Sequence, residues 1–254
     1  MMDNRLLEFM WAVVPILMYL FFVYIWTPKG YISPRRARRY LLAALISPML
    51  VIIFHYLLPK FFESRYFMNQ NIYFGYKIFI QTSLVEEVCK LLLFFAITFE
   101  RRSAKYDLPV AIVYYAMVTS AGFAIIENIS YLAQFGSDIL FVRAITAVIL
   151  HLICGVFMGY GIQIAVVKST DSTMTKIQTF LHRAKYVIIG LLSATIFHGI
   201  YDLVLTLPFI QYPNLIIGII LVSGLIISGF MIQNVIRLST KMRNEHYNKD
   251  IERK

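Results

Sequence analysis

The feature that most constrains the fold of this chain is the recurrence of apolar runs of about 20 residues along its whole length. Of its 254 residues, 59% are hydrophobic and only 15% are charged. A helix of about 20 residues crosses a hydrocarbon core of roughly 30 Å at about 1.5 Å per residue, and it satisfies its own backbone polar groups inside lipid. The sequence therefore predicts an all-α fold, a polytopic bundle of transmembrane helices.

Seven spans can be drawn, and together they form one membrane domain over residues 1–254. They run from Leu6 to Trp26, Tyr40 to Leu58, Asn71 to Thr98, Leu108 to Ala133, Ile139 to Val167, Tyr186 to Leu207 and Leu215 to Val235. Thr27-Pro28-Lys29, rather than a small-residue cleavage site, follows the first span, so we expect it to be a retained helix. Residues 236–254 form a basic tail.

The basic residues of the connections predict the orientation of the bundle. They gather in the first, third and fifth connections, at Lys29, Arg35, Arg36, Arg38, Arg39, Arg101, Arg102, Lys105, Lys168, Lys176, Arg183 and Lys185; the second holds only Lys60 and Arg65. The positive-inside rule then places the N-terminus outside and the basic tail in the cytoplasm. Topology thus explains the net charge of +10, and no nucleic-acid partner is expected.

Ionisable residues inside the spans are the second unusual feature, because each costs on the order of 3 kcal/mol in hydrocarbon. In the third span, Glu86 and Glu87 are adjacent, and Lys90 follows them one helical turn later. At these spacings one carboxylate can pair with the ammonium while the other faces elsewhere. The two glutamates can therefore take two roles, one as an orienting group and one as a general base. A buried structural ion pair is the alternative.

Later spans carry further polar groups: Glu127 and Asn128, then Arg143 and His151, then His198 and Asp202. Glu127 is open to three interpretations, as a metal ligand, a second acid or a partner of Arg143. Gly155 and Gly159 follow His151 at four-residue steps and predict close helix packing. Counted from the span ends, all these groups fall in or near the outer half of the bilayer, which predicts a pocket reached from outside the cytoplasm.

The order of these motifs resembles the PrsW family of intramembrane proteases, which is related to the superfamily of CAAX prenyl endopeptidases and bacteriocin-processing proteins. The matching motifs are Glu-Glu-x-x-Lys, Phe-Ala-x-x-Glu-Asn-x-x-Tyr, a histidine in a glycine-punctuated helix, and His-x-x-x-Asp, between Glu86 and Asp202. The resemblance implies a multi-pass protein of the bacterial cell membrane that makes the first cut in a membrane-anchored anti-sigma factor. It implies catalytic roles for Glu86, Glu87, His151 and His198.

Two versions of the chemistry fit these residues. In one, Glu86 is the base for a water, Lys90 positions Glu87, the histidines orient the water and stabilise the oxyanion, and Asp202 orients a histidine. In the other, two histidines and a glutamate bind zinc with one open position, so the cofactor is unknown, with zinc as the candidate. The rival functions are a transporter or proton relay, since buried charges also mark ion pathways, and a non-catalytic membrane scaffold.

Overall fold

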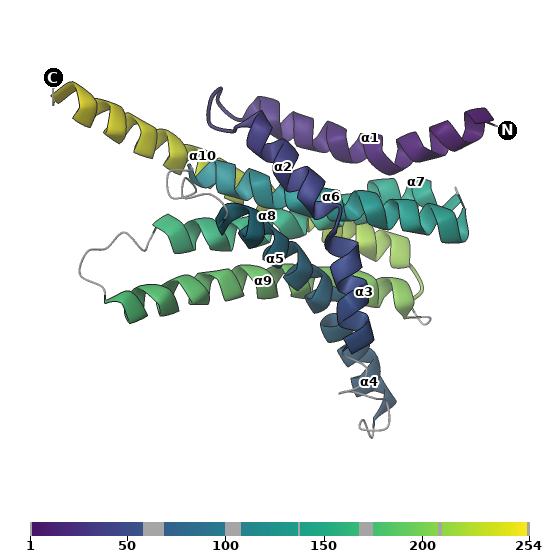
Figure 1. The fold of residues 1–254 in the computed structure, drawn as a ribbon. Coiled ribbons are helices and arrows are strands. Elements are labelled where there is room, and N and C mark those ends of the chain that lie inside the picture. The colour runs from purple at the N-terminus through teal and green to yellow at the C-terminus, as the bar shows by residue number, and fades with distance from the viewer. Residues whose placement is uncertain are drawn as a thin grey trace.

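The fold was analysed in a computed structural model, which describes residues 2–57, 69–99, 108–136, 138–167, 175–207 and 210–252. The regular structure of these residues is entirely helical (Figure 1). Its elements are α1 (Met2–Trp26), α2 (Pro34–Ala44), α3 (Ser47–Leu57), α4 (Gln70–Tyr76), the π-helical segment η3 (Lys77–Leu84), α5 (Val85–Phe99), α6 (Pro109–Phe135), α7 (Asp138–Ile145), α8 (Ala147–Val167), α9 (Lys176–Thr206) and α10 (Pro213–Glu252).

Helix α6 lies at the centre of the bundle and is buried along most of its length, from Pro109 to Ile125. It packs most extensively on α8, and α8 in turn packs on α9. Glycines permit the close approach of α6 and α8: a Cβ added at Gly155 would lie 2.8 Å from Met117 Cα, and one at Gly159 would lie 2.8 Å from Val113 Cα. The close helix packing predicted from Gly155 and Gly159 is thus confirmed.

Among the described residues, five helices are long and apolar enough to cross a membrane, namely Pro34–Leu57, Pro109–Phe135, Phe141–Val167, Lys176–Thr206 and Pro213–Glu245. Val13–Trp26 is a shorter apolar helix, and α4, η3 and α5 follow one another through the predicted third span. The predicted class, a bundle of membrane helices, is confirmed. The number of seven spans and the direction of insertion stay predictions.

Several helices extend further than the apolar pattern indicated. Lys176, Arg183 and Lys185, predicted to lie in a connection, belong to α9. This helix begins at a capping box in which the Thr175 hydroxyl accepts from the Gln178 amide and the Gln178 side chain accepts from the Thr175 amide. Likewise α10 continues through most of the predicted tail. Hydropathy marks the part of a helix that meets lipid, and a capped helix can continue beyond it.

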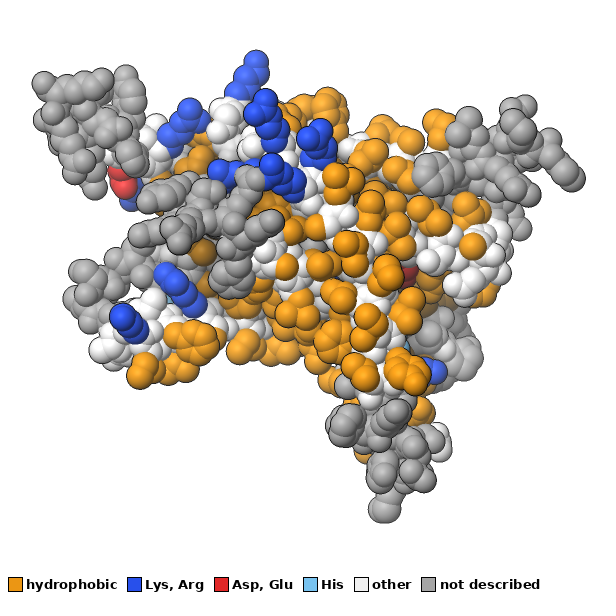
Figure 2. Space-filling view, in the orientation of Figure 1, with side chains coloured by type: hydrophobic (Ala, Val, Ile, Leu, Met, Phe, Trp, Pro, Cys, Tyr) orange, Lys and Arg blue, Asp and Glu red, His pale blue; other side chains and the backbone are white. Residues whose placement is uncertain are grey.

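The surface of the bundle has an apolar middle and a basic end. Figure 2 shows hydrophobic side chains across its middle and most of the visible Lys and Arg side chains toward the end where α1 is joined to α2. Such a distribution is typical of a membrane protein whose basic end faces the cytoplasm. Of the residues used to predict orientation, Lys60, Arg65, Arg101, Arg102, Lys105 and Lys168 lie outside the described part of the chain.

Candidate active site

The glutamate pair lies directly after the π-helical segment. Glu86 and Glu87 occupy the first turn of α5, and η3 ends at Leu84. Within η3, the hydroxyls of Thr82 and Ser83 donate to the backbone carbonyls five residues earlier, at 3.2 and 2.9 Å. The His55 ring, on α3, also donates to the Gln81 carbonyl at 2.8 Å. π-helical turns are frequent at functional sites.

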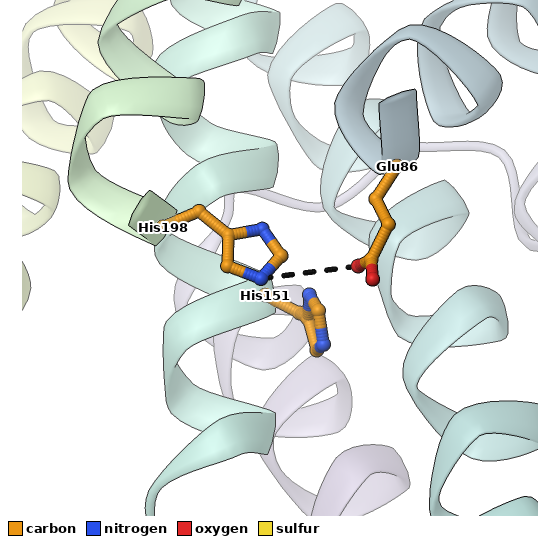
Figure 3. A group of neighbouring side chains, drawn as sticks. All are labelled: Glu86, His151 and His198. Atoms are coloured by element: carbon orange, nitrogen blue, oxygen red, sulfur yellow. Dashed lines mark ion pairs between the residues drawn. The ribbon is translucent and has the colours of Figure 1, made fainter. Parts of the chain in front are cut away.

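Glu86, His151 and His198 converge from three different elements, α5, α8 and α9 (Figure 3). All three are buried, with 8%, 1% and 4% of their surfaces exposed. His198 Nε2 lies 3.8 Å from Glu86 Oε2, and the centroids of the two imidazole rings are 5.2 Å apart. Glu86 Oε2 has no hydrogen-bond partner among the described residues. A buried carboxylate oxygen without a donor is expensive and points to a bound group or a reacting water.

Glu87 supports both histidines, His198 directly and His151 through Lys90. Its Oε1 accepts from Lys90 Nζ at 2.7 Å, as the spacing in the sequence predicted, and from His198 Nδ1 at 2.9 Å. Lys90 Nζ also donates to His151 Nδ1 at 2.9 Å and lies 4.3 Å from the centroid of the Phe123 ring. One buried ion pair therefore holds both histidines. Asp202, predicted to orient a histidine, lies 3.4 Å from His198 Nε2, so Glu87 is the nearer carboxylate to that ring.

The other side of His151 is held by Glu127 of α6. His151 Nε2 donates to Glu127 Oε2 at 2.7 Å. Arg143 of α7 lies 2.9 Å from the other oxygen of the same carboxylate and donates through Nε to the Asn128 amide oxygen at 3.2 Å. Its guanidinium also lies 3.6 Å from the centroid of the Tyr131 ring. Glu127 is thus both the partner of Arg143 and a direct support of His151.

These groups line a cavity of about 360 Å³. Glu86, Glu127, His151, His198 and Asp202 form its polar wall. Residues from the last turns of α6 and α9 also line it, so it lies toward the end of the bundle opposite the basic connections. The structure therefore brings together every site residue that the sequence singled out, with Lys90 and Glu87 behind the wall.

The sequence of this chain matches the model of the PrsW family of intramembrane metalloproteases over residues 36–228. This chain belongs to that family. The matched region runs from α2 into α10 and contains the whole candidate site. Membership, together with the long apolar helices, confirms the prediction of a multi-pass protein of the bacterial cell membrane.

Curated relatives in bacteria carry the name Protease PrsW. The relative in Oceanobacillus iheyensis is 32% identical over 127 residues, which cover 50% of this chain and 53% of the relative. The relative in Bacillus subtilis is 37% identical over 95 residues, which cover 37% and 38% of the two chains. The relative in Halalkalibacterium halodurans is 28% identical over 172 residues, which cover 67% and 69%. The first of these matches spans about half of the relative's length. No solved structure matches this chain.

A PrsW family metalloprotease needs a metal site, and the residues here fit one. Ligand atoms of Glu86, His151 and His198 all lie within 4.8 Å of one another. Two histidines and a carboxylate are a familiar zinc set, and a second carboxylate behind each imidazole is typical of such sites. Glu87 stands behind His198 and Glu127 behind His151.

The formal charges agree with this fit. With neutral histidines, the four carboxylates outnumber Lys90, Arg143 and Lys77, which lines the same cavity, by one, so the site keeps a net negative formal charge that favours a cation. One adjustment is required, because both ring nitrogens of His151 already have partners in Lys90 and Glu127. His151 would have to exchange one of these hydrogen bonds for the metal. A second group, Glu87, Cys154 and His198, is less suitable because Glu87 is paired with Lys90.

Sequence reasoning missed several residues of the cavity wall. Phe74, Thr82 and Tyr201 all line it, and the Tyr201 hydroxyl donates to the Thr146 hydroxyl at 2.8 Å. Tyr201 had a usable signal, since it follows His198 by three residues and so shares its helix face. Thr82 had none, because its approach to the site depends on how η3 packs against α9, and Phe74 lies on α4, which leads into η3.

Proposed function

We propose that this chain is an intramembrane endopeptidase that cleaves a membrane-anchored protein on the side opposite the basic end of the bundle. The observation that carries the proposal is the buried Glu86 carboxylate, which has an unpartnered oxygen and faces two histidines at the wall of a cavity. Membership in a family of intramembrane metalloproteases supports it. The activity of the chain is a proposal because the segment matched to the Oceanobacillus iheyensis relative covers only 53% of that protein.

The proposed roles follow from the hydrogen bonds. In the version without a metal, Glu86 accepts a proton from the water that attacks the scissile carbonyl, and the same proton then passes to the leaving amine. His198, held at Nδ1 by Glu87, directs Nε2 toward Glu86 and the cavity and orients the water. A protonated imidazole at His198, whose Nε2 faces Glu86 and the cavity, stabilises the oxyanion. Glu127, Asn128 and Arg143 fix His151, and Lys90 fixes Glu87.

Zinc is the metal we propose for this site, with Glu86, His151 and His198 as its protein ligands. A bound zinc ion would act as a Lewis acid that polarises the carbonyl and makes the water more acidic. Glu86 would then be occupied as a ligand. Asp202 lines the cavity, and its side chain is 23% exposed. It would then be the carboxylate that accepts the proton of the attacking water.

We propose a single-span protein of the anti-sigma factor class as the substrate. The basis is the resemblance of the motifs between Glu86 and Asp202 to a family that makes the first cut in such proteins. The position of the cavity, toward the end of the bundle away from the basic connections, agrees with a cut outside the cytoplasm. The cavity must also admit an unfolded stretch of peptide, so we expect cleavage near the membrane surface.

The experiment is cleavage of candidate single-span substrates in proteoliposomes by the full chain. Glu86→Gln keeps the shape of the side chain but removes the base, so we expect at least a 100-fold loss of rate. Glu245→Gln, on the exposed part of α10, is the matched control and should be fully active. Cleavage that persists in Glu86→Gln would show that another group activates the water.

Two further measurements on the same vesicles separate the remaining alternatives. Metal analysis of an active preparation should find about one zinc per chain, and a chelator should abolish cleavage until zinc is added back. An active preparation that contains no stoichiometric metal would eliminate the zinc site but keep the glutamate mechanism. Ion flux without cleavage of any substrate would indicate that the protein is a transporter and not a protease.

A further inference from the structure

A second cavity, of about 370 Å³, lies between α1, α6, α8 and α10, away from the candidate active site. None of the residues that line it lines the active-site cavity. Its walls are largely apolar and include Phe22 and Val23 of α1, Leu152 and Val156 of α8, and Leu225 and Ile232 of α10. We call it the α1–α10 groove. Its shape and lining are suited to a hydrocarbon chain.

One end of this groove is basic. Arg237 lines it there, and Trp26 and Pro28 lie at the end of α1 on the opposite wall. An adjoining cavity shares Ile236 and Arg237 with the groove and adds Thr240 and Lys241, among others. Arg237 has no ion-pair partner within the part of the chain that the structure describes. Lys241 has a weak one, since Glu245 is 3.9 Å away and both side chains are exposed.

The interior of the groove holds an unsatisfied polar group. Ser228 lines it and is 4% exposed, yet its hydroxyl has no hydrogen-bond partner among the described residues. Ser223 and Ser239 on the same helix instead donate to carbonyls of their own helix. Ser228 lies nine residues before Arg237, or about 13 Å along the helix. A small rotation of its side chain would present a donor to an acceptor in the groove.

We propose that the α1–α10 groove binds one anionic phospholipid from the cytoplasmic leaflet. Its phosphate would lie at Arg237 and Lys241, and an acyl chain would run along the groove toward Leu225. The unpaired cation at the end of an apolar groove supplies the charge complementarity, and basic pockets between helices on this side of a membrane favour anionic headgroups. Trp26 stands at the same end, at a level suited to the interface.

The α1 wall of the groove and its basic end lie outside the region matched to the family model, whereas the α6 and α8 walls and Leu225 lie inside it. That match covers residues 36–228, whereas α1 ends at Trp26 and Arg237 follows the match by nine residues. The groove and the active-site cavity share no lining residue, so the lipid site does not depend on the catalytic residues or on the proposed peptidase reaction. Its failure and the failure of that reaction are separate experimental outcomes.

Two glycines of α10 allow a matched test of the groove. A Cβ added at Gly229 or at Gly218 meets nothing within 4 Å, but only Gly229 lines the groove. Gly229→Leu should therefore fill the groove without displacing a helix, while Gly218→Leu should alter only an exposed surface. The full chain is purified in detergent, delipidated, and mixed with phosphatidylglycerol or phosphatidylcholine of the same acyl chains. Bound lipid is then counted by native mass spectrometry.

We expect one phosphatidylglycerol per chain, retained at least ten-fold better than phosphatidylcholine. Gly229→Leu should reduce this occupancy at least ten-fold, and Gly218→Leu should leave it unchanged. The double variant Arg237→Gln and Lys241→Gln should remove the preference for the anionic lipid, whereas Arg183→Gln, on α9, should retain it. Equal retention of both lipids, or full binding by Gly229→Leu, would overturn the proposal. So would a dimer that Gly229→Leu dissociates, because a second copy would then be the occupant.

Discussion

The Glu87 side chain shows how far individual residues were predictable. Its pairing with Lys90 followed from the three-residue spacing on a helix, because that spacing alone brings the two groups within reach. Its second hydrogen bond, to His198, was not predictable, since 111 residues separate the two and only the packing of α5 on α9 brings them together. The same holds for the hydrogen bond between Glu127 and His151. Local spacing identified the candidates, and packing determines their partners.

At this scale we predict that Lys90→Met destabilises the protein. Both Lys90 and Glu87 are completely buried, so the substitution leaves a carboxylate in the core without its cation. Removing one partner of such a pair costs about 3–5 kcal/mol. The unfolding free energy in mixed micelles measures this loss. The double variant Lys90→Met and Glu87→Gln should recover more than half of it, and a double variant as unstable as Lys90→Met alone would contradict the explanation.

At the scale of whole elements, the small-residue spacing of α8 correctly indicated a close helix contact, whereas helix interruptions were not predictable. The predicted second span is divided into α2 and α3 around Leu45 and Ile46, and the predicted fifth span into α7 and α8 at Thr146. The π-helical segment η3 also had no signal in the apolar pattern. Periodicity reports which face of a helix is apolar. It is insensitive to an irregular turn that both neighbouring segments tolerate.

The tight contact between α6 and α8 leads to the second prediction, for Gly155→Ala. The added Cβ would lie 2.8 Å from Met117 Cα and 3.1 Å from the Ala116 carbonyl oxygen, and backbone atoms cannot move aside singly. The helices must separate, so we expect a loss of about 1–3 kcal/mol in unfolding free energy. His151 is one turn away on α8, and cleavage should therefore slow as well. Gly218→Ala, where the added Cβ meets open space, should change neither quantity.

At the scale of the molecule, the basic residues and the candidate active site lie toward opposite ends of the bundle. The sequence predicted this separation, because loop charge and the depth of each polar residue can both be counted along the chain. Hydropathy could not predict how far α9 and α10 extend beyond the lipid. It could not predict the α1–α10 groove either, since a cavity depends on how four helices meet.

The orientation itself gives the third prediction. Gln134→Cys, near the end of α6, should react with a membrane-impermeant maleimide on intact cells, whereas Lys241→Cys on α10 should react only after permeabilisation. Both positions are exposed. The native thiols of Cys89 and Cys154 are buried and should give little background. Labelling of Lys241→Cys in intact cells would reverse the predicted topology.

The wide turns of η3 join α4 to α5, and they change the rotational position of α5 about the helix axis relative to α4. Each residue of an α-helix advances the chain by about 100°, so the wider π-helical turns offset the face before them from the face after them. Phe74 of α4 precedes η3, Lys77 and Ile78 are the first residues of η3, and the glutamate pair follows it. A change in the number of these wide turns would therefore rotate Phe74 relative to the glutamate pair about the helix axis.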